Sequence, residues 1–388
     1  MTTESTLDAR DRRAEVCAVA EREARRIDEG AEFPVEALAA MRRTGLLGLL
    51  VPGEFGGAGG TLTDLIDTTM ELGRADASVA MIFAMHCQQA VTLARCGGDR
   101  LRAAVLPAVA RGEIYLGSVT TDPGTGGSLL SSDSALERAG TSLHIDRLAP
   151  VVTGGPHADG FLLTMRAADA TSPHQVTLVY AGRDQLRLEV LGGWRSLGMR
   201  ATHSVPMRLV GDVPDWQVLG RHADFRTIAA TVFAPLAHIG WAAAWLGTAA
   251  GACSRVLGHV RSPAGRKQFS PTSELLLTRL ATVRARLDVV HALLQHTARV
   301  VEDCDDMSAT PVQLLLNALK TQAAEHCFAA VHELIEATGL RHGYLTDSPL
   351  ALERAFRDLR SASLNYANDR LLLASGALSL LDTGVHLA

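Results

Sequence analysis

The pattern of hydrophobic and polar positions changes its period twice along the chain. Apolar side chains recur at helical spacing from about residue 7 to 115, as at Leu38, Met41 and Leu46. Between about 116 and 220, short apolar runs alternate with turn residues, which predicts strands at 143–145, 160–164, 176–180 and 186–190. Long helical stretches then return at 228–257, 273–304 and 311–338. We therefore expect a helical domain at 1–115, a β domain at 116–222 and a helical bundle at 223–388.

Composition and charge exclude several classes of function. Hydrophobic residues make up 47% of the chain and charged residues 20%, as in ordinary globular proteins. The net charge is −5 and no block rich in Lys or Arg occurs, so we expect no nucleic-acid partner. The N-terminus has no signal-peptide pattern, and no uninterrupted apolar run reaches about 18 residues. We therefore expect a cytoplasmic protein with no membrane partner.

The cysteines and the apolar helices bear on metal binding and on assembly. None of the six cysteines forms a CxxC pair, and their spacings suit neither a zinc site nor a disulfide framework. We therefore predict no metal. The stretch from Ala242 to Ala250 is apolar on more than one helical face, which is typical of a helix buried in a large core or against another subunit. We expect a homo-oligomer.

Three short motifs could bind a ligand, although each also has a structural interpretation. The segment from Val119 to Gly127 resembles a strand followed by a glycine loop, which lets the backbone approach a phosphate or a ring closely. It does not match GxGxxG, and its composition alone favours a tight structural turn. Thr153 at a predicted strand end could bond a ligand or form a turn. Arg266–Phe269 could supply a phosphate-binding cation and an aromatic ring, or simply end a helix in solvent.

In their order and spacing, these motifs resemble the acyl-CoA dehydrogenase superfamily over nearly the whole chain. The elements that carry the resemblance are Gly45–Gly57, Thr121–Gly127, Val151–Thr153, Leu197–Arg200, Arg266–Phe269 and the closing stretch from Gly339 to Asp358. The resemblance implies an acyl-CoA dehydrogenase-like fold, with an N-terminal all-α domain, a central β-barrel-like domain and a C-terminal four-helix bundle. It also implies assembly as a homodimer or a homotetramer.

The resemblance further implies a bound flavin, FAD rather than FMN because Arg266 is present. Thr121 and the loop at Gly126-Gly127 would contact the pyrimidine edge of the ring and the pyrophosphate. Thr153 would hydrogen-bond flavin N5, the atom that takes part in the chemistry. Val151 stands where the family has a Trp that covers one flavin face. The predicted cofactor-binding residues are Thr120, Thr121, Gly126, Gly127, Val151, Val152, Thr153, Arg266, Gln268, Phe269, Gly339 and Asn368.

The catalytic glutamate of the family's dehydrogenases is missing from this sequence. Those enzymes need a carboxylate to remove the proton α to a thioester carbonyl, and they place it eight residues after an Arg-Asp pair. That position here is Tyr366, whose ordinary pKa near 10 makes it a base worse by about 4 kcal/mol at neutral pH. A second family position falls at about Ala237, again without an acid, and a family arginine falls at His238. Asp369 is a possible displaced base.

Three functions remain open from the sequence. The chain resembles the superfamily's flavin-dependent monooxygenases, which hydroxylate N or C atoms of small molecules of secondary metabolism with reduced flavin from a partner flavin reductase. Alternatives are an acyl-CoA or acyl-carrier-protein dehydrogenase with a displaced base, and a catalytically silent subunit of a hetero-oligomer. The predicted catalytic residues are His86, Thr153, Asn365 and Tyr366, and the predicted substrate contacts are His86, Ala237, His238, Tyr366 and Asp369. His86 could instead be a core histidine bonded to the backbone.

Overall fold

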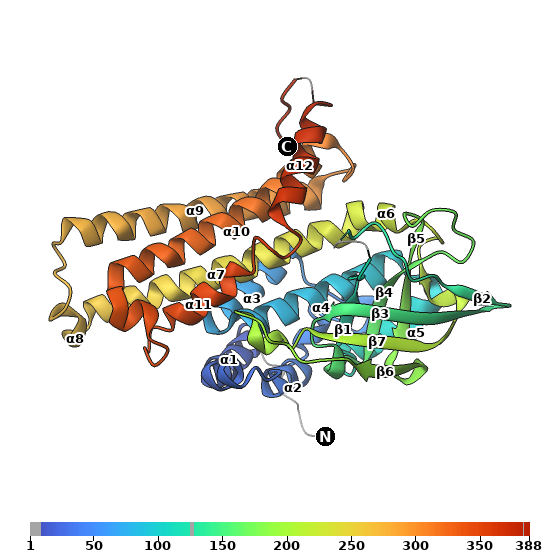
Figure 1. Ribbon diagram of the computed structural model, residues 1–388, viewed down its shortest axis with the longest axis horizontal. Coiled ribbons are helices and arrows are strands. Elements are labelled where there is room, and N and C mark those ends of the chain that lie inside the picture. The colour runs from blue at the N-terminus through green and yellow to red at the C-terminus, as the bar shows by residue number, and fades with distance from the viewer. Residues whose placement is uncertain (1–8, 125–127, 383) are drawn as a thin grey trace. The chain divides into compact units, whose positions relative to one another are not determined.

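The computed structural model describes residues 9–124, 128–382 and 384–388, which form two compact units (Figure 1). The first unit contains the described residues up to Leu65, together with Ile82–Arg195 and Ala201–Ala237. The second contains Ile66–Met81, Ser196–Arg200 and the described residues from His238 onward. These units are defined by which residues pack together, whereas the predicted domains are defined by their type of secondary structure. The bounds of the three predicted domains therefore stay predictions.

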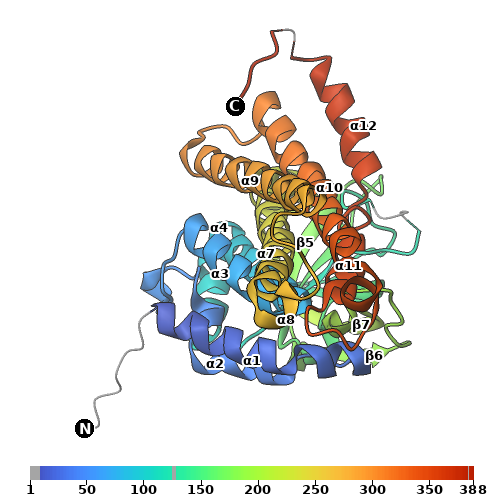
Figure 2. The same ribbon diagram turned by 90° about the vertical axis from the view of Figure 1, so that its left-hand side faces the viewer.

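The first unit begins with helices that pack through one apolar face each. Its helices are α1 (Ala9–Gly30), α2 (Val35–Arg43), most of α4 (Ala77–Cys96) and α5 (Asp99–Ala110). In α1 the buried side chains recur every three to four residues, at Val16, Ala20, Ala24 and Ile27, which turns one stripe of the helix inward. The two views agree that α1 and α2 lie side by side (Figures 1 and 2).

Two four-stranded sheets complete the first unit. One has the strand order β1-β4-β5-β8 and the other β2-β3-β7-β6. The strands are β1 (Leu116–Val119), β2 (Glu137–Ala139), β3 (Ser142–Val152), β4 (Gly160–Arg166), β5 (Val176–Gly182), β6 (Leu186–Val190), β7 (Val205–Pro214) and β8 (Val218–Leu219). β5 is buried along its whole length and is apolar except for Thr177, whereas β3 alternates between buried and exposed residues.

The sequence pattern found β3 to β6 but missed β2, β7 and β8, of which β7 is the longest. This strand contains Pro206, Gly211 and Pro214, which suggest turns in a sequence. Here the partner strands tolerate them, since β7 pairs antiparallel with both β3 and β6. The register of β3 with β7 shifts between Ala149 and Val152, so β3 ends in an irregularity immediately before Thr153.

The second unit is helical. Its helices are α3 (Leu62–Ala75) from Ile66 onward, α7 (Ala234–Arg261) from His238 onward, α8 (Pro263–Arg266), α9 (Glu274–Asp303), α10 (Thr310–Gly339), α11 (Leu352–Arg360) and α12 (Asn368–Ser379). Helices α9 and α10 lie side by side in both views (Figures 1 and 2). A short helix, α6 (Phe225–Ile228), and a π-helical segment, Ala229–Phe233, lead into α7.

Two helical stretches are long and apolar enough to cross a membrane by length and composition alone. They are Ala77–Cys96 and Phe225–Arg261, and 89% and 72% of their most apolar windows are buried inside the structure. Core helices have the same length and composition when other elements cover them, so the hydropathy of these two stretches is accounted for by packing.

Glycines bring α3 and α7 into close contact within the second unit. A Cβ atom at Gly247 would lie 2.3 Å from the carbonyl oxygen of Met70, and one at Gly73 would lie 2.7 Å from the carbonyl oxygen of Ala244. Both distances are too short for any side chain, so the two helix backbones can approach this closely only with glycine at these positions.

We predict opposite effects for alanine at two glycines of α7. Gly247→Ala should lower the free energy of unfolding by roughly 1–3 kcal/mol, because the helices must separate. Gly258→Ala is the matched control, since a Cβ there meets nothing within 4 Å. That change should raise stability by up to about 1 kcal/mol by removing helix-interior glycine. Urea unfolding of both variants measures the difference, and equal effects would contradict the close approach.

Candidate functional site

The end of β3 carries the first group of predicted site residues. The Thr121 hydroxyl donates to the carbonyl of Val151 at 2.9 Å and accepts the N–H of Val151 at 3.2 Å. This pair of bonds ties the start of the glycine loop to β3. Val151 is 37% exposed, whereas Val152 is fully buried, so any contact of Val152 with a ligand would have to come from its backbone.

Thr153 belongs to a chain of three hydroxyl groups. Its Oγ1 lies 2.9 Å from Oγ of Ser204, which in turn lies 2.8 Å from Oγ1 of Thr202. Ser204 and Thr202 are buried, whereas Thr153 is half-buried. The chain fixes the direction of the Thr153 hydroxyl, the group predicted to bond the flavin ring. Ser204 escaped the sequence analysis because the loop that brings it to β3 is not visible in the local pattern.

A buried ion pair anchors the start of the glycine loop to β3. Arg147 on β3 is completely buried; its Nη1 donates to Asp122, and its Nη2 donates to the carbonyl of Thr121 at 2.9 Å. Asp122 also accepts the Ser132 hydroxyl at 3.2 Å and the N–H of Asp133 at 3.1 Å. Burial alone would raise the pKa of Asp122, but the Arg147 charge and these donors hold it below its ordinary value.

The loop itself is described only up to Gly124. Gly126 and Gly127, predicted to contact the flavin, lie outside the described residues. Thr120 is half-buried immediately after β1, at the position where the loop leaves the sheet. The contacts of Thr121, Asp122 and Arg147 therefore fix the entry to the loop, and the cofactor contacts of the loop stay predictions.

His86 is bonded to the backbone at both ring nitrogens. Its Nε2 donates to the carbonyl of Leu47 at 2.8 Å, and its Nδ1 accepts the N–H of Leu116 at 3.0 Å. The side chain is completely buried, and burial lowers its pKa to about 4. The imidazole therefore stays neutral and joins helix α4 to strand β1. This geometry matches the alternative in which His86 is a core histidine bonded to the backbone. Neither ring nitrogen is left free for the predicted catalytic role.

The second group of predicted residues meets in the second unit, around His238. The ring of Tyr366 lies edge-on to the His238 imidazole, with 6.4 Å between ring centroids. His238 Nδ1 donates to the carbonyl of Leu316 on α10 at 3.1 Å, and burial lowers the pKa of His238 to about 4. Burial also raises the pKa of Tyr366 to about 12, so Tyr366 cannot act as a base at neutral pH.

Lys320 completes this group, and the sequence analysis did not single it out. The side chain is fully buried, and its Nζ donates to the carbonyl of Tyr366 at 3.1 Å and to Oδ1 of Asn368 at 2.7 Å. The amide nitrogen of Asn368 donates to Glu325 at 3.3 Å. Both ends of the Asn368 side chain are thus engaged within the unit, which leaves its predicted cofactor contact without support.

The remaining predicted residues of this region differ in exposure. Ala237 is buried, Asn365 is half-buried and Asp369 is exposed in the first turn of α12. The Arg-Asp pair used to locate Tyr366 is anchored, because the Asp358 carboxylate accepts the N–H of Met199 at 2.6 Å. Two of the sequence motifs therefore contact each other here.

The Arg266–Phe269 motif lies at a cavity of about 220 Å³. Gln268 and Phe269 line it together with Arg279 of α9, and Arg266 is exposed nearby in the chain. The amide oxygen of Gln268 accepts a hydrogen bond from Nε2 of His342 at 3.1 Å. The amide nitrogen of Gln268 therefore points away from the His342 ring. Gly339 ends α10 with φ of 68°, a conformation that suits glycine.

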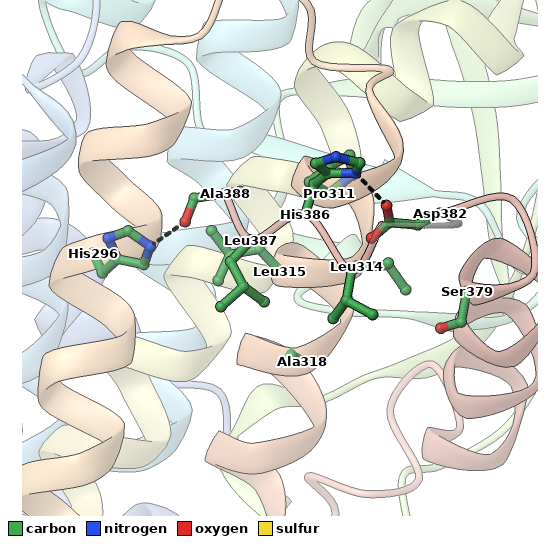
Figure 3. A pocket seen from close by; sticks show the side chains of 11 residues that line it. His296, Pro311, Leu314, Leu315, Ala318, Ser379, Asp382, His386, Leu387 and Ala388 are labelled. Carbon is green, nitrogen blue, oxygen red and sulfur yellow. Dashed lines mark hydrogen bonds and ion pairs between the residues drawn. The ribbon is translucent and has the colours of Figure 1, made fainter.

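A larger cavity, of about 520 Å³, lies at the other end of α10 (Figure 3). Leucines of α10 and the segment Val385–Ala388 give it a largely apolar lining. His296 Nε2 donates to the backbone carbonyl of Ala388 at 2.7 Å. None of the predicted site residues is among those that line this cavity.

The described residues fit a flavin in two separate places. In the first unit, the oriented Thr153 hydroxyl and the partly exposed Val151 suit the edge and face of a polar ring. In the second unit, the exposed Arg266 and the cavity beside Phe269 suit a phosphate and an adenine. Within the described residues, no group of three or more His, Cys, Asp or Glu side chains is placed to hold a metal ion.

We predict that removing one member of the buried Asp122–Arg147 pair costs far more than removing both. Arg147→Met should lower the free energy of unfolding by about 3–5 kcal/mol, because Asp122 is left buried without its counter-charge. Adding Asp122→Asn should recover much of that loss. Arg208→Met is the control, since it removes the neighbouring exposed pair with Asp146, which should contribute less than about 1 kcal/mol. Equal losses in the single and double variants, measured by urea unfolding, would contradict this assignment.

The two buried histidines predict a loss of stability in acid. The folded pKa values of His86 and His238 are about 4, below the ordinary value near 6.5, so the unfolded chain binds protons that the folded chain does not. Stability should therefore fall between pH 6.5 and 4, by up to about 3 kcal/mol for each group. His86→Gln should flatten this dependence in urea unfolding at several pH values, whereas the exposed control His291→Gln should leave it unchanged.

Comparisons with known proteins support the same family from sequence and from structure. The chain matches the model of the acyl-CoA dehydrogenase N-terminal domain over residues 6–113 and that of the acyl-CoA dehydrogenase C-terminal domain over residues 239–370. An acyl-CoA dehydrogenase of Bacillus subtilis (strain 168) is 24% identical over 340 residues, which cover 85% of each chain. A dibenzothiophene monooxygenase of Rhodococcus qingshengii is 24% identical over 356 residues, covering 84% of this chain and 82% of the relative.

A solved structure shows the likeness in fold. The crystal structure of FMN-bound TdsC from Paenibacillus sp. A11-2 superposes with a TM-score of 0.85 at 22% identity, covering 96% of this chain and 97% of that one. The expected fold is therefore confirmed, with two four-stranded sheets in its central part. Membership confirms the predicted flavin cofactor, for which FAD is the norm in the family. The two family models together span more than half of the chain, which thus belongs to the acyl-CoA dehydrogenase family of flavin-dependent oxidoreductases.

Proposed function

We propose that this protein is a monooxygenase that uses reduced flavin and O2 to hydroxylate an N or C atom of a small molecule. The observation that carries the proposal is the chemistry at the two positions where the family's dehydrogenases hold their glutamate. Tyr366 occupies one, with its pKa raised by burial to about 12, and Ala237 occupies the other. Neither residue can remove an α proton at neutral pH, whereas hydroxylation does not begin with that step.

Reduced FAD would supply the electrons that activate O2, with FMN the less favoured cofactor. Thr153 would bond the flavin ring, since Ser204 holds the direction of its hydroxyl. Arg266 and Phe269 would hold the phosphate and adenine end, beside the cavity that Phe269 lines.

Within this group, His238 is the best-oriented acceptor of a hydrogen bond. Its Nδ1 hydrogen is committed to the Leu316 carbonyl, so the neutral imidazole carries its lone pair on Nε2. Such a nitrogen can accept a hydrogen bond from an N–H or O–H of a substrate and orient it. The half-buried Asn365 and Tyr366 would line the same substrate site.

The likeness to a dibenzothiophene monooxygenase supports this proposal, and the likeness to an acyl-CoA dehydrogenase supports the alternative. In the alternative, Asp369 would be the displaced base of an acyl-CoA or acyl-carrier-protein dehydrogenase, with a carrier- or CoA-bound substrate. The exposure of Asp369 disfavours this, because a base for an α proton needs a site that excludes water.

We also propose a flavin reductase as partner, a cytoplasmic location, and assembly as a homodimer or homotetramer. The large exposed side chains of α12 support assembly, since Leu372 and Leu373 are 50% and 78% exposed and Leu380, just beyond the helix, is 83% exposed. Leucines gathered at one end of a chain usually mark a surface that another subunit covers.

Two assays on the flavin-loaded protein separate the functions. Anaerobic mixing with acyl-CoA thioesters of increasing length should leave the visible flavin absorbance unchanged. Adding a flavin reductase, NADH and O2 to a panel of aromatic and amine probes, beginning with dibenzothiophene, should give a hydroxylated or oxygenated product detected by mass spectrometry. Bleaching by an acyl-CoA that Asp369→Asn abolishes would overturn the proposal in favour of the dehydrogenase. Inactivity in both assays would favour the silent subunit.

A further inference from the structure

Lysine is almost absent from this chain, and one of its lysines is buried. Only two of the 37 basic residues are lysines, Lys267 and Lys320. Lys267 is exposed after α8, whereas Lys320 is fully buried on α10. A buried ammonium group is costly unless hydrogen bonds compensate it, so its contacts have to account for its presence.

The contacts of Lys320 converge on the turn that leads into α12. Its Nζ donates to the carbonyl of Tyr366 and to the side-chain oxygen of Asn368, and Asn368 in turn donates to Glu325. Tyr366 has φ of 54°, in the left-handed region that a bulky residue rarely adopts. Such a backbone persists only when its surroundings hold it, and the bond from Lys320 to the Tyr366 carbonyl is one that does so.

The neighbouring turn of α10 binds His238. The carbonyl that accepts from His238 Nδ1 belongs to Leu316, one helical turn before Lys320. The ammonium charge lies close enough to disfavour a second positive charge on the imidazole, and it lowers the pKa of His238 in addition to the larger effect of burial. Tyr366 touches both groups, because its ring meets His238 and its carbonyl meets Lys320.

Two indoles line this group and leave polar atoms without partners. The Trp241 ring lies 6.3 Å from that of His238, and Lys320 Nζ lies 5.8 Å from the centre of the Trp245 ring. Among the described residues, neither indole N–H finds an acceptor. The group therefore has more hydrogen-bond donors than acceptors on the side of the two indoles, and Glu325 is the carboxylate that contacts it through Asn368.

We propose that Lys320 is a positioning residue, whose ammonium group binds the carbonyl of Tyr366 and the side chain of Asn368 and so holds the left-handed backbone of Tyr366 in place beside the neutral His238. The importance of this turn for catalysis rests on the proposed function, whereas the contacts of Lys320 do not. A site arranged in this way disfavours a cationic substrate. It favours a neutral or anionic molecule that presents an N–H or O–H to His238.

The scarcity of lysine allows the charge of Lys320 to be observed directly. Protein labelled with ¹³C at lysine Cε should give two side-chain resonances, which Lys267→Arg assigns. Lys320 should titrate at about 8, since burial lowers its pKa and Glu325 raises it only partly. Asn368→Asp places a carboxylate against the ammonium group and should move the Lys320 titration to higher pH.

Lys320→Met tests the positioning role without any substrate. Amide hydrogen exchange in the peptide 361–370 should become faster by roughly tenfold or more, which corresponds to losing one charge-assisted hydrogen bond. Protonation of His238 beside Trp241 should change the tryptophan fluorescence as the pH is lowered. In Lys320→Met this change should occur at a higher pH, because a neighbouring positive charge is removed, and His238→Gln should abolish it. Lys267→Met is the matched control and should change neither measurement.

The possible outcomes separate this inference from the proposed function. A Lys320 resonance that titrates at the ordinary lysine pKa of about 10.4, or unchanged exchange of 361–370 in Lys320→Met, would overturn the positioning role whatever reaction the protein catalyses. If Lys320→Met does not fold, Asn368→Asp alone decides, because an unmoved Lys320 titration contradicts the contact. If the Lys320 titration and the hydrogen exchange of 361–370 agree with the expected results while acyl-CoA bleaches the flavin, the positioning role stands and the monooxygenase proposal is rejected.

Discussion

The turn between α11 and α12 is fixed at both ends by buried polar contacts, and the predicted site residues of the second unit depend on it. At its start, the Asp358 carboxylate accepts the N–H of Met199. At its end, Lys320 holds the carbonyl of Tyr366 and the side chain of Asn368. Because the segment is held at both ends, the position of Tyr366 relative to Asp358 is fixed in the fold. The prediction that Tyr366 stands at the glutamate position uses this same spacing of eight residues.

The sequence predicts the elements well where one period dominates. The long helices α9 and α10 and the buried strand β5 follow directly from their patterns. β7 was missed because Pro206 and Gly211 suggest turns, and only pairing with β3 and β6 on either side reveals a strand. The assignment of Tyr366 to the glutamate position comes from the local order of a motif, and it stays a prediction.

The site contacts that the sequence could not supply are those between distant segments. Thr153 and Ser204, or Arg147 and Asp122, are joined by sheet register rather than by spacing, so no local pattern announces them. His86 shows the reverse error. A histidine in an apolar helix looks available for chemistry, but Leu47 and Leu116 come from separate segments and occupy both nitrogens. A buried polar side chain is satisfied by whatever backbone the fold brings to it.

The choice of lysine at 320 follows from the number of acceptors that the fold provides. An arginine carries five donors in a rigid fork, which suits the site of Arg147, where a carboxylate, a hydroxyl and a carbonyl surround it. At Lys320 two neutral oxygens accept hydrogen bonds from an ammonium group that has three donors, whereas a guanidinium group would bring five donors to the same two acceptors. Lysine also differs in that burial can bring its pKa toward neutrality, whereas arginine stays charged. A chain that otherwise relies on arginine therefore places its one buried lysine where two oxygens bind a single ammonium group beside His238.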